Sequence, residues 1–221
     1  MGTEVSQRLV DIALFDLDGT IADTLPLIYE AFDAAFIPAL GSGFTPAEVR
    51  AMFGPPDHEI IRSRVSAALA NEAIDRYNRR YSERHAALVS IFPDLDVLLE
   101  ACVAAGIKLG VVTGKSRSTA LVTLDQLGLL DSFPVLYAGD DVERQKPAPD
   151  ALLLALRDLD ASASDRIVMI GDSAADVSAG RAAGVRAIAV RWGSPDHDEL
   201  EASTPDDIVN SVAELSSLLL R

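Results

Sequence analysis

The sequence predicts an α/β fold, with a doubly wound, Rossmann-like parallel sheet as its core and an α-helical cap inserted into it. Three observations predict this fold: short apolar runs alternate with helical periodicity, one long stretch near the N-terminus lacks a convincing strand, and Asp/Gly clusters follow two of the runs. Strands that alternate with helices form βαβ units, which place helices on both faces of a mainly parallel sheet. A chain of 221 residues has room for one such core and an insertion.

Apolar, partly β-branched runs with the length of buried parallel strands define the predicted core. They cover residues 10–15, 107–112, 135–138, 167–170 and 187–190. Gly106, Gly128 and Gly184 stand where helices would end before a strand or a turn. We therefore assign residues 1–22 and 92–221 to the core, with a closing amphipathic helix at the C-terminus.

Residues 23–91 are predicted to form the helical cap. Its expected helices span residues 27–40, 46–53, 57–70 and 71–89. We expect cap side chains to determine substrate specificity, and the candidates are Phe53 to Pro56, His58, Arg62 and Arg64. A solvated helix face is an equally simple interpretation of His58 and Arg62, which are four residues apart.

Composition excludes several classes of partner. The formal net charge is −15, from 34 acidic and 19 basic side chains, so nucleic-acid and membrane-surface binding are not expected. Any phosphate site must then be made locally by a cation, a lysine or backbone amides. The only cysteine, Cys102, lies in an apolar stretch and is expected in the core. No run resembles a signal peptide or a membrane span, so we expect cytoplasmic residence.

The segment Asp16-Leu17-Asp18-Gly19-Thr20 follows the first predicted strand directly. Two carboxylates therefore lie at the carboxyl end of a strand, where open α/β sheets bind their ligands. The DxDGT pattern arises by chance on the order of once in 100,000 positions, from average residue frequencies. It therefore indicates chemistry rather than a plain Asp-Gly turn.

Three later motifs bring further polar groups to the same edge of the sheet. Asp172 and Asp176 follow the fourth predicted strand, where a helix cap and a magnesium site are both compatible interpretations. Thr113 and Gly114 end the second strand, where backbone amides or a Thr helix cap fit equally. Lys146 precedes a Pro at a predicted helix start, and a solvated loop lysine is the competing interpretation.

In their order along the chain, these motifs resemble the four signature motifs of the haloacid dehalogenase-like superfamily. The position of the cap after the first motif, together with Asp23-Thr24 and Trp192-Gly193, resembles the subgroup of phosphoglycolate phosphatases, pyrophosphatases and β-phosphoglucomutases. The sequence departs from this subgroup at Asp94, where a Gly commonly follows the Pro, and at Gln145, where a Gly commonly precedes the Lys-Pro. Both departures put loop geometry in doubt.

The resemblance implies a Mg²⁺-dependent, phosphoglycolate phosphatase-like phosphohydrolase that acts on a small-molecule phosphate ester. Asp16 would attack phosphorus to form an aspartyl-phosphate, while Asp18 would protonate the leaving oxygen and later activate water. Lys146 would offset charge on the nucleophile and the phosphate.

The resemblance also implies a set of ligands. The side chains of Asp16 and Asp172 and the backbone carbonyl of Asp18 would bind Mg²⁺, with Asp176 orienting these ligands. Thr113 and Gly114 would hold the phosphate oxygens. The side chain of Lys115, next in the sequence, could equally point into solvent.

Other activities stay open at this point. The presence of Asp18 argues against a dehalogenase, and the predicted cap contains no lysine of the kind that phosphonate hydrolases use. A pyrophosphatase or a β-phosphoglucomutase-like phosphomutase is the nearest alternative, and a phosphoryl-accepting signalling module is an alternative from a different class. Neither the metabolite nor the oligomeric state follows from the sequence.

Overall fold

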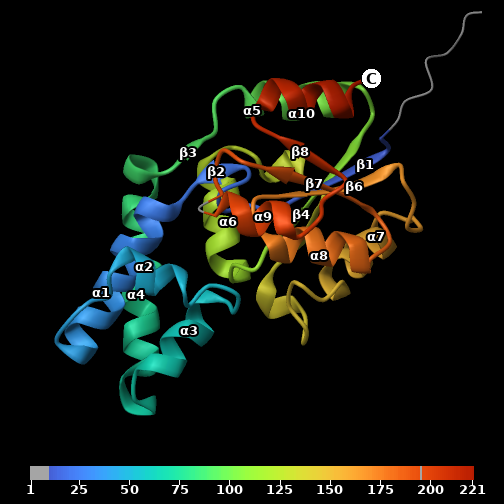
Figure 1. The fold of residues 1–221 in the computed structure, drawn as a ribbon. Coiled ribbons are helices and arrows are strands. Elements are labelled where there is room, and N and C mark those ends of the chain that lie inside the picture. Colours follow the sequence, from blue (N-terminus) through green and yellow to red (C-terminus); the bar gives the residue numbers. More distant parts are fainter. Residues whose placement is uncertain (1–9, 195) are drawn as a thin grey trace, which may run out of the picture.

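A six-stranded parallel sheet forms the centre of the computed structural model, which describes residues 10–194 and 196–221 (Figure 1). The strand order is β5-β4-β1-β6-β7-β8, and every neighbouring pair is parallel. The strands are β1 (Ile12–Phe15), β4 (Lys108–Val112), β5 (Val135–Tyr137), β6 (Ile167–Gly171), β7 (Arg186–Val190) and β8 (Asp207–Val209). Each predicted apolar run overlaps a strand, which confirms the α/β class. Residues 1–9, on which the expectation of no signal peptide depends, lie outside the described residues.

Helices cover both faces of the sheet. The helices α5 (Leu95–Ala104) and α10 (Val212–Leu219) lie on one face, and α7 (Asp150–Asp158) and α8 (Ala174–Ala182) lie on the other (Figure 1). Successive strand residues alternate between these faces: Phe15 packs in the cluster that contains α5 and α10, and Leu14 in the cluster that contains α7 and α8. Cys102 is buried on α5, as predicted. The other core helices are α6 (Arg117–Gln126), α9 (His197–Ala202), η1 (Leu130–Ser132) and η2 (Gly139–Asp141).

The inserted stretch forms a separate group of helices beside the sheet (Figure 1). Its elements are α1 (Leu25–Leu40), α2 (Pro46–Arg50), α3 (Asp57–Arg64) and α4 (Ala67–Leu88). The two-stranded antiparallel sheet of β2 (Ala22–Asp23) and β3 (Ser90–Ile91) joins the points where the chain leaves and re-enters the core. One buried hydrophobic cluster continues from Phe15 under the sheet to Phe32 and Tyr77 among these helices. No helix in the described part of the chain has the length and apolar character of a membrane span.

The predicted boundary between the third and fourth cap helices was wrong. We expected it between residues 70 and 71, but α3 ends at Arg64 and α4 begins at Ala67. Val65 and Ser66 adopt extended backbone angles, and Ser66 is the N-cap residue of α4. Since Ser favours the N-cap position, it was the available signal. The strands β2, β3 and β8 were not predicted because they are too short to show a periodic pattern.

The predicted helix ends are confirmed, and Asp94, one of the departures from the subgroup pattern, has the same type of backbone conformation. Gly106, Gly128 and Gly184 have φ angles of 77°, 70° and 75°, in the left-handed region that favours glycine. Asp94 also adopts this region, with φ 66°, and its side chain makes no capping hydrogen bond to α5. The structure therefore places a non-glycine residue where glycine has the lower conformational cost.

We expect the substitution Asp94→Gly to stabilise the protein. Left-handed backbone costs a non-glycine residue about 1–2 kcal/mol, part of which is offset by the larger freedom of glycine in the unfolded chain. The free energy of unfolding, measured by urea denaturation, should rise by up to about 1 kcal/mol. The control Asp96→Gly, within α5, should lower it by a similar amount. A loss of stability in Asp94→Gly would contradict this account of the loop.

Candidate active site

The carboxyl ends of three neighbouring strands meet at one cavity. Asp16 directly follows β1, Thr113 follows β4 and Asp172 follows β6, and β1 lies between the other two strands. The cavity has a volume of about 470 Å³ and lies between these ends and the helices α1 to α4. The predicted site residues that line it are Asp16, Asp18, Thr113, Gly114, Lys146 and Asp172. The structure thus brings residues from four distant motifs to one place.

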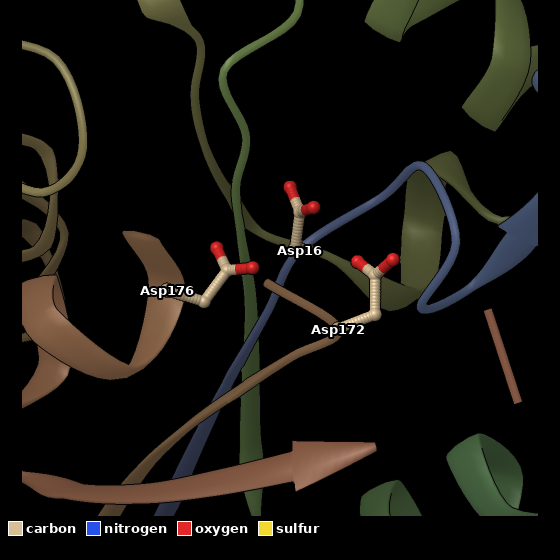
Figure 2. A group of neighbouring side chains, drawn as sticks. All are labelled: Asp16, Asp172 and Asp176. Carbon is tan, nitrogen blue, oxygen red and sulfur yellow. The ribbon is translucent and has the colours of Figure 1, made fainter. Parts of the chain in front are cut away.

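Three buried carboxylates form a cluster at the ends of β1 and β6 (Figure 2). Oxygen atoms of Asp16, Asp172 and Asp176 lie within 4.8 Å of one another. The Nζ atom of Lys146 donates to Asp16 Oδ1 at 3.0 Å and to Asp176 Oδ1 at 2.5 Å. The interpretation of Lys146 as a solvated loop lysine was therefore wrong. One ammonium group faces three carboxylates, so the cluster has a deficit of positive charge.

The pKa values express this deficit. Burial raises the pKa of Asp16 to about 6. The positive charge of Lys146 lowers this pKa, and the negative charges of Asp176 and Asp18 raise it further. Burial and the charge of Asp16 also hold the pKa of Asp172 well above its ordinary value. A divalent cation would relieve both effects, and carboxylate oxygens are the ligands that Mg²⁺ prefers. The donor set of Asp16 and Asp172 therefore fits Mg²⁺.

Asp176 serves as a helix cap and as a partner of Lys146 at the same time. Its backbone N–H donates to Ser173 Oγ at 3.3 Å, and its Oδ2 atom accepts from the Ser173 N–H at 3.1 Å, which closes a capping box at the start of α8. Its Oδ1 atom accepts from Lys146. Both interpretations of this motif are thus compatible with the structure, and protein donors already engage both oxygens of Asp176.

Two glycines allow the backbone to approach the carboxylates. A Cβ atom on Gly19, which has φ 78°, would lie 2.3 Å from Asp172 Oδ2. A Cβ atom on Gly171 would lie 2.3 Å from side-chain atoms of Asp176. These distances are far below van der Waals contact, so each position requires glycine if the cluster is to close.

Asp18 is held by two side chains that the sequence left without a role. Thr24 Oγ1 donates to Asp18 Oδ1 at 2.5 Å, and Lys115 Nζ lies 3.3 and 3.2 Å from the two carboxylate oxygens. Lys115 is buried, and its ammonium group lies 4.4 Å from the centre of the Tyr81 ring on α4. The alternative in which Lys115 points into solvent was therefore wrong. Lys115 instead fixes the position of the Asp18 carboxylate.

We expect Lys115→Met to reduce kcat by about 10- to 100-fold, because an unheld Asp18 loses the orientation that proton transfer needs. KM should change much less, since Lys115 is already occupied by Asp18. Steady-state kinetics on the best substrate measure both. Lys108→Met is the matched control, because Lys108 Nζ donates to the Leu159 carbonyl away from the cavity. An unchanged kcat in Lys115→Met would refute the positioning role.

The residue Thr113 is buried at the end of β4, and its backbone N–H donates to the Tyr137 carbonyl. Its Oγ1 atom accepts from the Lys115 N–H at 3.2 Å. Gly114 lies against the cap loop, where a Cβ atom would be 3.4 Å from the Gly54 carbonyl oxygen. The predicted phosphate loop and the predicted specificity loop therefore contact each other.

The cap contributes a wall that the sequence predicted in part. Phe53, Gly54 and Pro55 line the cavity, as expected, whereas the other candidates are not among its lining residues: Pro56, His58, Arg62 and Arg64. The polar lining residues of the cap that were missed are Arg50, Asp57 and Tyr77. Asp57 is at the start of a predicted helix, and Tyr77 lies within a helical pattern. Secondary structure alone accounted for both residues in the sequence, so neither indicated a place in the cavity.

Asp57 connects the cap to the core. It is buried at the start of α3, where its Oδ2 atom accepts from Thr119 Oγ1 on α6 at 2.7 Å. A second contact joins Tyr81 on α4 to Thr123 on α6 through their hydroxyl groups, 2.8 Å apart. Helix α6, which begins just after the phosphate loop, is thus the surface on which the cap rests.

Residues 13–190 match the family model of haloacid dehalogenase-like hydrolases. The chain is 32% identical over 212 residues to the pyrophosphatase PpaX of Bacillus mycoides, covering 96% of this chain and 98% of that protein. It is 35% identical over 213 residues to the plasmid phosphoglycolate phosphatase of Cupriavidus necator, covering 93% and 91%.

Solved structures agree with the fold. The chain is similar to CbbY from Rhodobacter sphaeroides in complex with phosphate, with a TM-score of 0.83, 27% identity and coverage of 96% and 100%. It also resembles a predicted phosphoglycolate phosphatase from Haemophilus somnus 129pt, with a TM-score of 0.87, 20% identity and coverage of 96% and 99%. Since the family model spans most of the chain and relatives above 30% identity cover nearly all of it, this protein belongs to the haloacid dehalogenase-like hydrolase family.

Proposed function

We propose that this hydrolase is a Mg²⁺-dependent phosphatase that cleaves a small phosphate ester through an aspartyl-phosphate on Asp16. The observation that carries the proposal is the cluster of Asp16, Asp172, Asp176 and Lys146 beside the cavity. Family membership and the phosphatase names of the relatives support the enzyme class. The chain's acidity supports a small-molecule partner rather than a nucleic acid.

Charge neutralisation is the first requirement of the reaction, because a phosphate ester repels a carboxylate nucleophile. When bound, Mg²⁺ supplies the positive charge that offsets both anions. Asp16, Asp172 and the backbone carbonyl of Asp18 would hold it, and Asp176 would orient this shell. Lys146 adds an ammonium group, and its Nζ atom lies 3.0 Å from Asp16 Oδ1.

Two displacements then follow. The carboxylate of Asp16 attacks phosphorus, the bond to the leaving oxygen breaks, and Asp18 donates a proton to that oxygen. In the second step Asp18 takes a proton from water, which attacks the acyl phosphate and releases phosphate from Asp16. Thr113 and Gly114 would hold the phosphate oxygens in both steps.

We also propose that residues 23–91 act as a cap over a core of residues 1–22 and 92–221. The β2–β3 pair, which joins the two ends of the insertion, supports this division. The contacts that α3 and α4 of the insertion make with α6 of the core also support it. A cap that excludes bulk water would protect the acyl phosphate from unproductive hydrolysis. Cytoplasmic residence stays an expectation from the sequence.

The test is phosphate release from a panel of small phosphate esters and pyrophosphate, with Mg²⁺ and with EDTA. We expect turnover with Mg²⁺ and a loss of at least about 100-fold with EDTA, because the carboxylate cluster then lacks its counter-charge. Excess Mg²⁺ should restore the rate. Turnover that survives EDTA would contradict the metal dependence, and no release from any ester would favour a phosphomutase or a non-catalytic role.

A further inference from the structure

The cap side of the cavity is mainly apolar. Side chains from α1 and α3 contribute Leu25, Ile28, Phe32 and Ile60. Ile28, Phe32 and Ile60 are otherwise buried, with exposures of 5%, 2% and 5%. The volume of about 470 Å³ is within the range of small-molecule sites, roughly 300–1,000 Å³, so it can hold a leaving group as well as phosphate. A leaving group in this space must contact hydrocarbon.

One hydroxyl group in this wall makes no hydrogen bond to the residues that the structure describes. Tyr77 is 1% exposed and lines the cavity, and within residues 10–194 and 196–221 its hydroxyl makes no hydrogen bond. Its ring is fixed against Phe32, with the ring centres 4.8 Å apart. Burial, with the charges of Asp57 and Asp18, raises the pKa of Tyr77 well above its ordinary value, so the hydroxyl keeps its proton. Because Tyr77 lines the cavity and its hydroxyl is uncommitted, a hydroxyl on a ligand in the cavity could pair with it.

The charged residues around the cavity disfavour a second anion. Asp57 is buried and accepts from two neutral donors, Thr119 Oγ1 and the His58 N–H, and its nearest basic atom is His58 Nδ1 at 3.9 Å. Asp196 and Glu199 line the cavity from the α9 side. Asp196 and Glu199 are exposed and therefore screened by solvent, so the buried Asp57 is the acidic side chain beyond the catalytic ones that a carboxylate on the leaving group would meet with least screening.

The cations that line the cavity are largely committed. Lys115 is paired with Asp18, and Lys146 with the carboxylate cluster. Arg50 is the remaining basic side chain among the lining residues, but it is exposed and its guanidinium donates to the Tyr29 hydroxyl at 2.8 Å. An exposed guanidinium is screened by solvent, whereas the buried Asp57 is not.

We infer that the phosphate ester taken by this site has an uncharged alcohol as its leaving group, with an apolar part against Phe32 and Ile60 and a free hydroxyl that pairs with Tyr77. The inference rests on the proposed phosphatase function and names its substrate class. It ranks esters of neutral diols and polyols above 2-phosphoglycolate and above pyrophosphate. Tyr77 and Asp57 are then specificity residues: Tyr77 binds the free hydroxyl of the leaving group, and Asp57 repels a leaving group that carries a carboxylate.

Matched substrates test this directly in the wild-type enzyme. Glycerol 1-phosphate differs from 3-phosphoglycerate, and 2-hydroxyethyl phosphate from 2-phosphoglycolate, by a CH₂OH group in place of a carboxylate. We expect kcat/KM to be higher for the neutral member of each pair by about tenfold or more, the size of one unfavourable charge contact. A preference for the carboxylate members would overturn the inference and leave the phosphatase standing. No release from any of the four esters would instead count against the proposed function.

The variant Tyr77→Phe tests the attractive contact. It should lower kcat/KM for 2-hydroxyethyl phosphate by about 3- to 10-fold, the effect of one lost hydrogen bond. Its kcat/KM for ethyl phosphate, which lacks the hydroxyl, should stay unchanged. Tyr137→Phe is the matched control, because the Tyr137 hydroxyl donates to Asp158 outside the cavity. Equal losses on both esters would show that Tyr77 has only a structural role and would refute the contact.

The variant Asp57→Asn tests the exclusion. Asn can still accept from Thr119, but it removes the buried charge, so the preference for neutral over carboxylate esters should fall by about tenfold. Asp75→Asn on α4, outside the lining, should leave the preference unchanged. Arg50→Gln tests the opposite interpretation, in which Arg50 binds an anionic leaving group. If the wild-type enzyme prefers carboxylate esters and Arg50→Gln abolishes that preference, the inference is wrong.

Discussion

The substitution Asp16→Asn is expected to reduce phosphate release by about 10⁴-fold or more, because an amide cannot attack phosphorus. The fold should persist, since Asn has nearly the same shape. Burial raises the pKa of Asp16 to about 6, from the unfolded value of 3.8, so ionised Asp16 opposes folding at neutral pH, and this penalty shrinks as the pH falls from 6 to 3.8. Without Mg²⁺, the free energy of unfolding of Asp16→Asn at pH 7 should therefore not fall below that of the wild type.

Phosphate release with Mg²⁺ and urea denaturation without it measure these two effects. Asp125→Asn, exposed on α6, is the matched control and should leave both unchanged. Mass spectrometry of acid-quenched wild-type enzyme should detect a phosphorylated peptide that contains Asp16. If Asp16→Asn kept about a tenth of the wild-type rate, far above the loss expected for a missing nucleophile, Asp16 would not be the attacking group.

The substitution Lys146→Met should damage both stability and activity. Burial opposes the charged form of Lys146, but Asp16 and Asp176 outweigh it and raise its pKa, so the ammonium group is charged. Its removal leaves three buried carboxylates without a protein cation. Breaking a buried ion pair in this way costs about 3–5 kcal/mol. We also expect kcat to fall by about 100-fold or more, because charge on the phosphate is no longer offset.

The stability loss in Lys146→Met has a diagnostic dependence on conditions. It should shrink at pH 5, where the unpaired carboxylates take up protons, and in the presence of Mg²⁺, which replaces part of the missing charge. Urea denaturation at pH 5 and pH 7, with and without Mg²⁺, measures this. Lys108→Met, away from the cluster, should show neither dependence. A loss that is the same under all four conditions would point to packing rather than charge.

Much of the catalytic edge could be predicted because parallel strands end at the same edge of a sheet. Asp16 directly follows an apolar run and Asp172 follows another after one glycine, so their meeting required only that β1 and β6 be neighbours. The reach of Lys146 into the cluster could not be predicted in the same way. It lies in the irregular segment before α7, and no periodic pattern gives the direction of a side chain there.

The contacts between the cap and the core were beyond sequence reasoning. Helical periodicity indicates that Tyr77 and Tyr81 share a buried face of α4, but not which part of the core that face meets. The pairing of Lys115 with Asp18, and of Asp57 with Thr119, depends on how the insertion docks on α6. Such contacts arise from tertiary packing, which leaves no repeating signal along the chain.

The hydrophobic cluster that runs from the sheet into α1 and α4 bears on how far the insertion can move. Phe15 in the core and Phe32 in the insertion belong to the same buried set of side chains. Wide separation of the two parts would expose hydrocarbon to water, which is unfavourable in proportion to the area exposed. The resting population should therefore be dominated by a nearly shut form, and substrate entry should need only a small hinge displacement, with the whole chain melting in one cooperative transition.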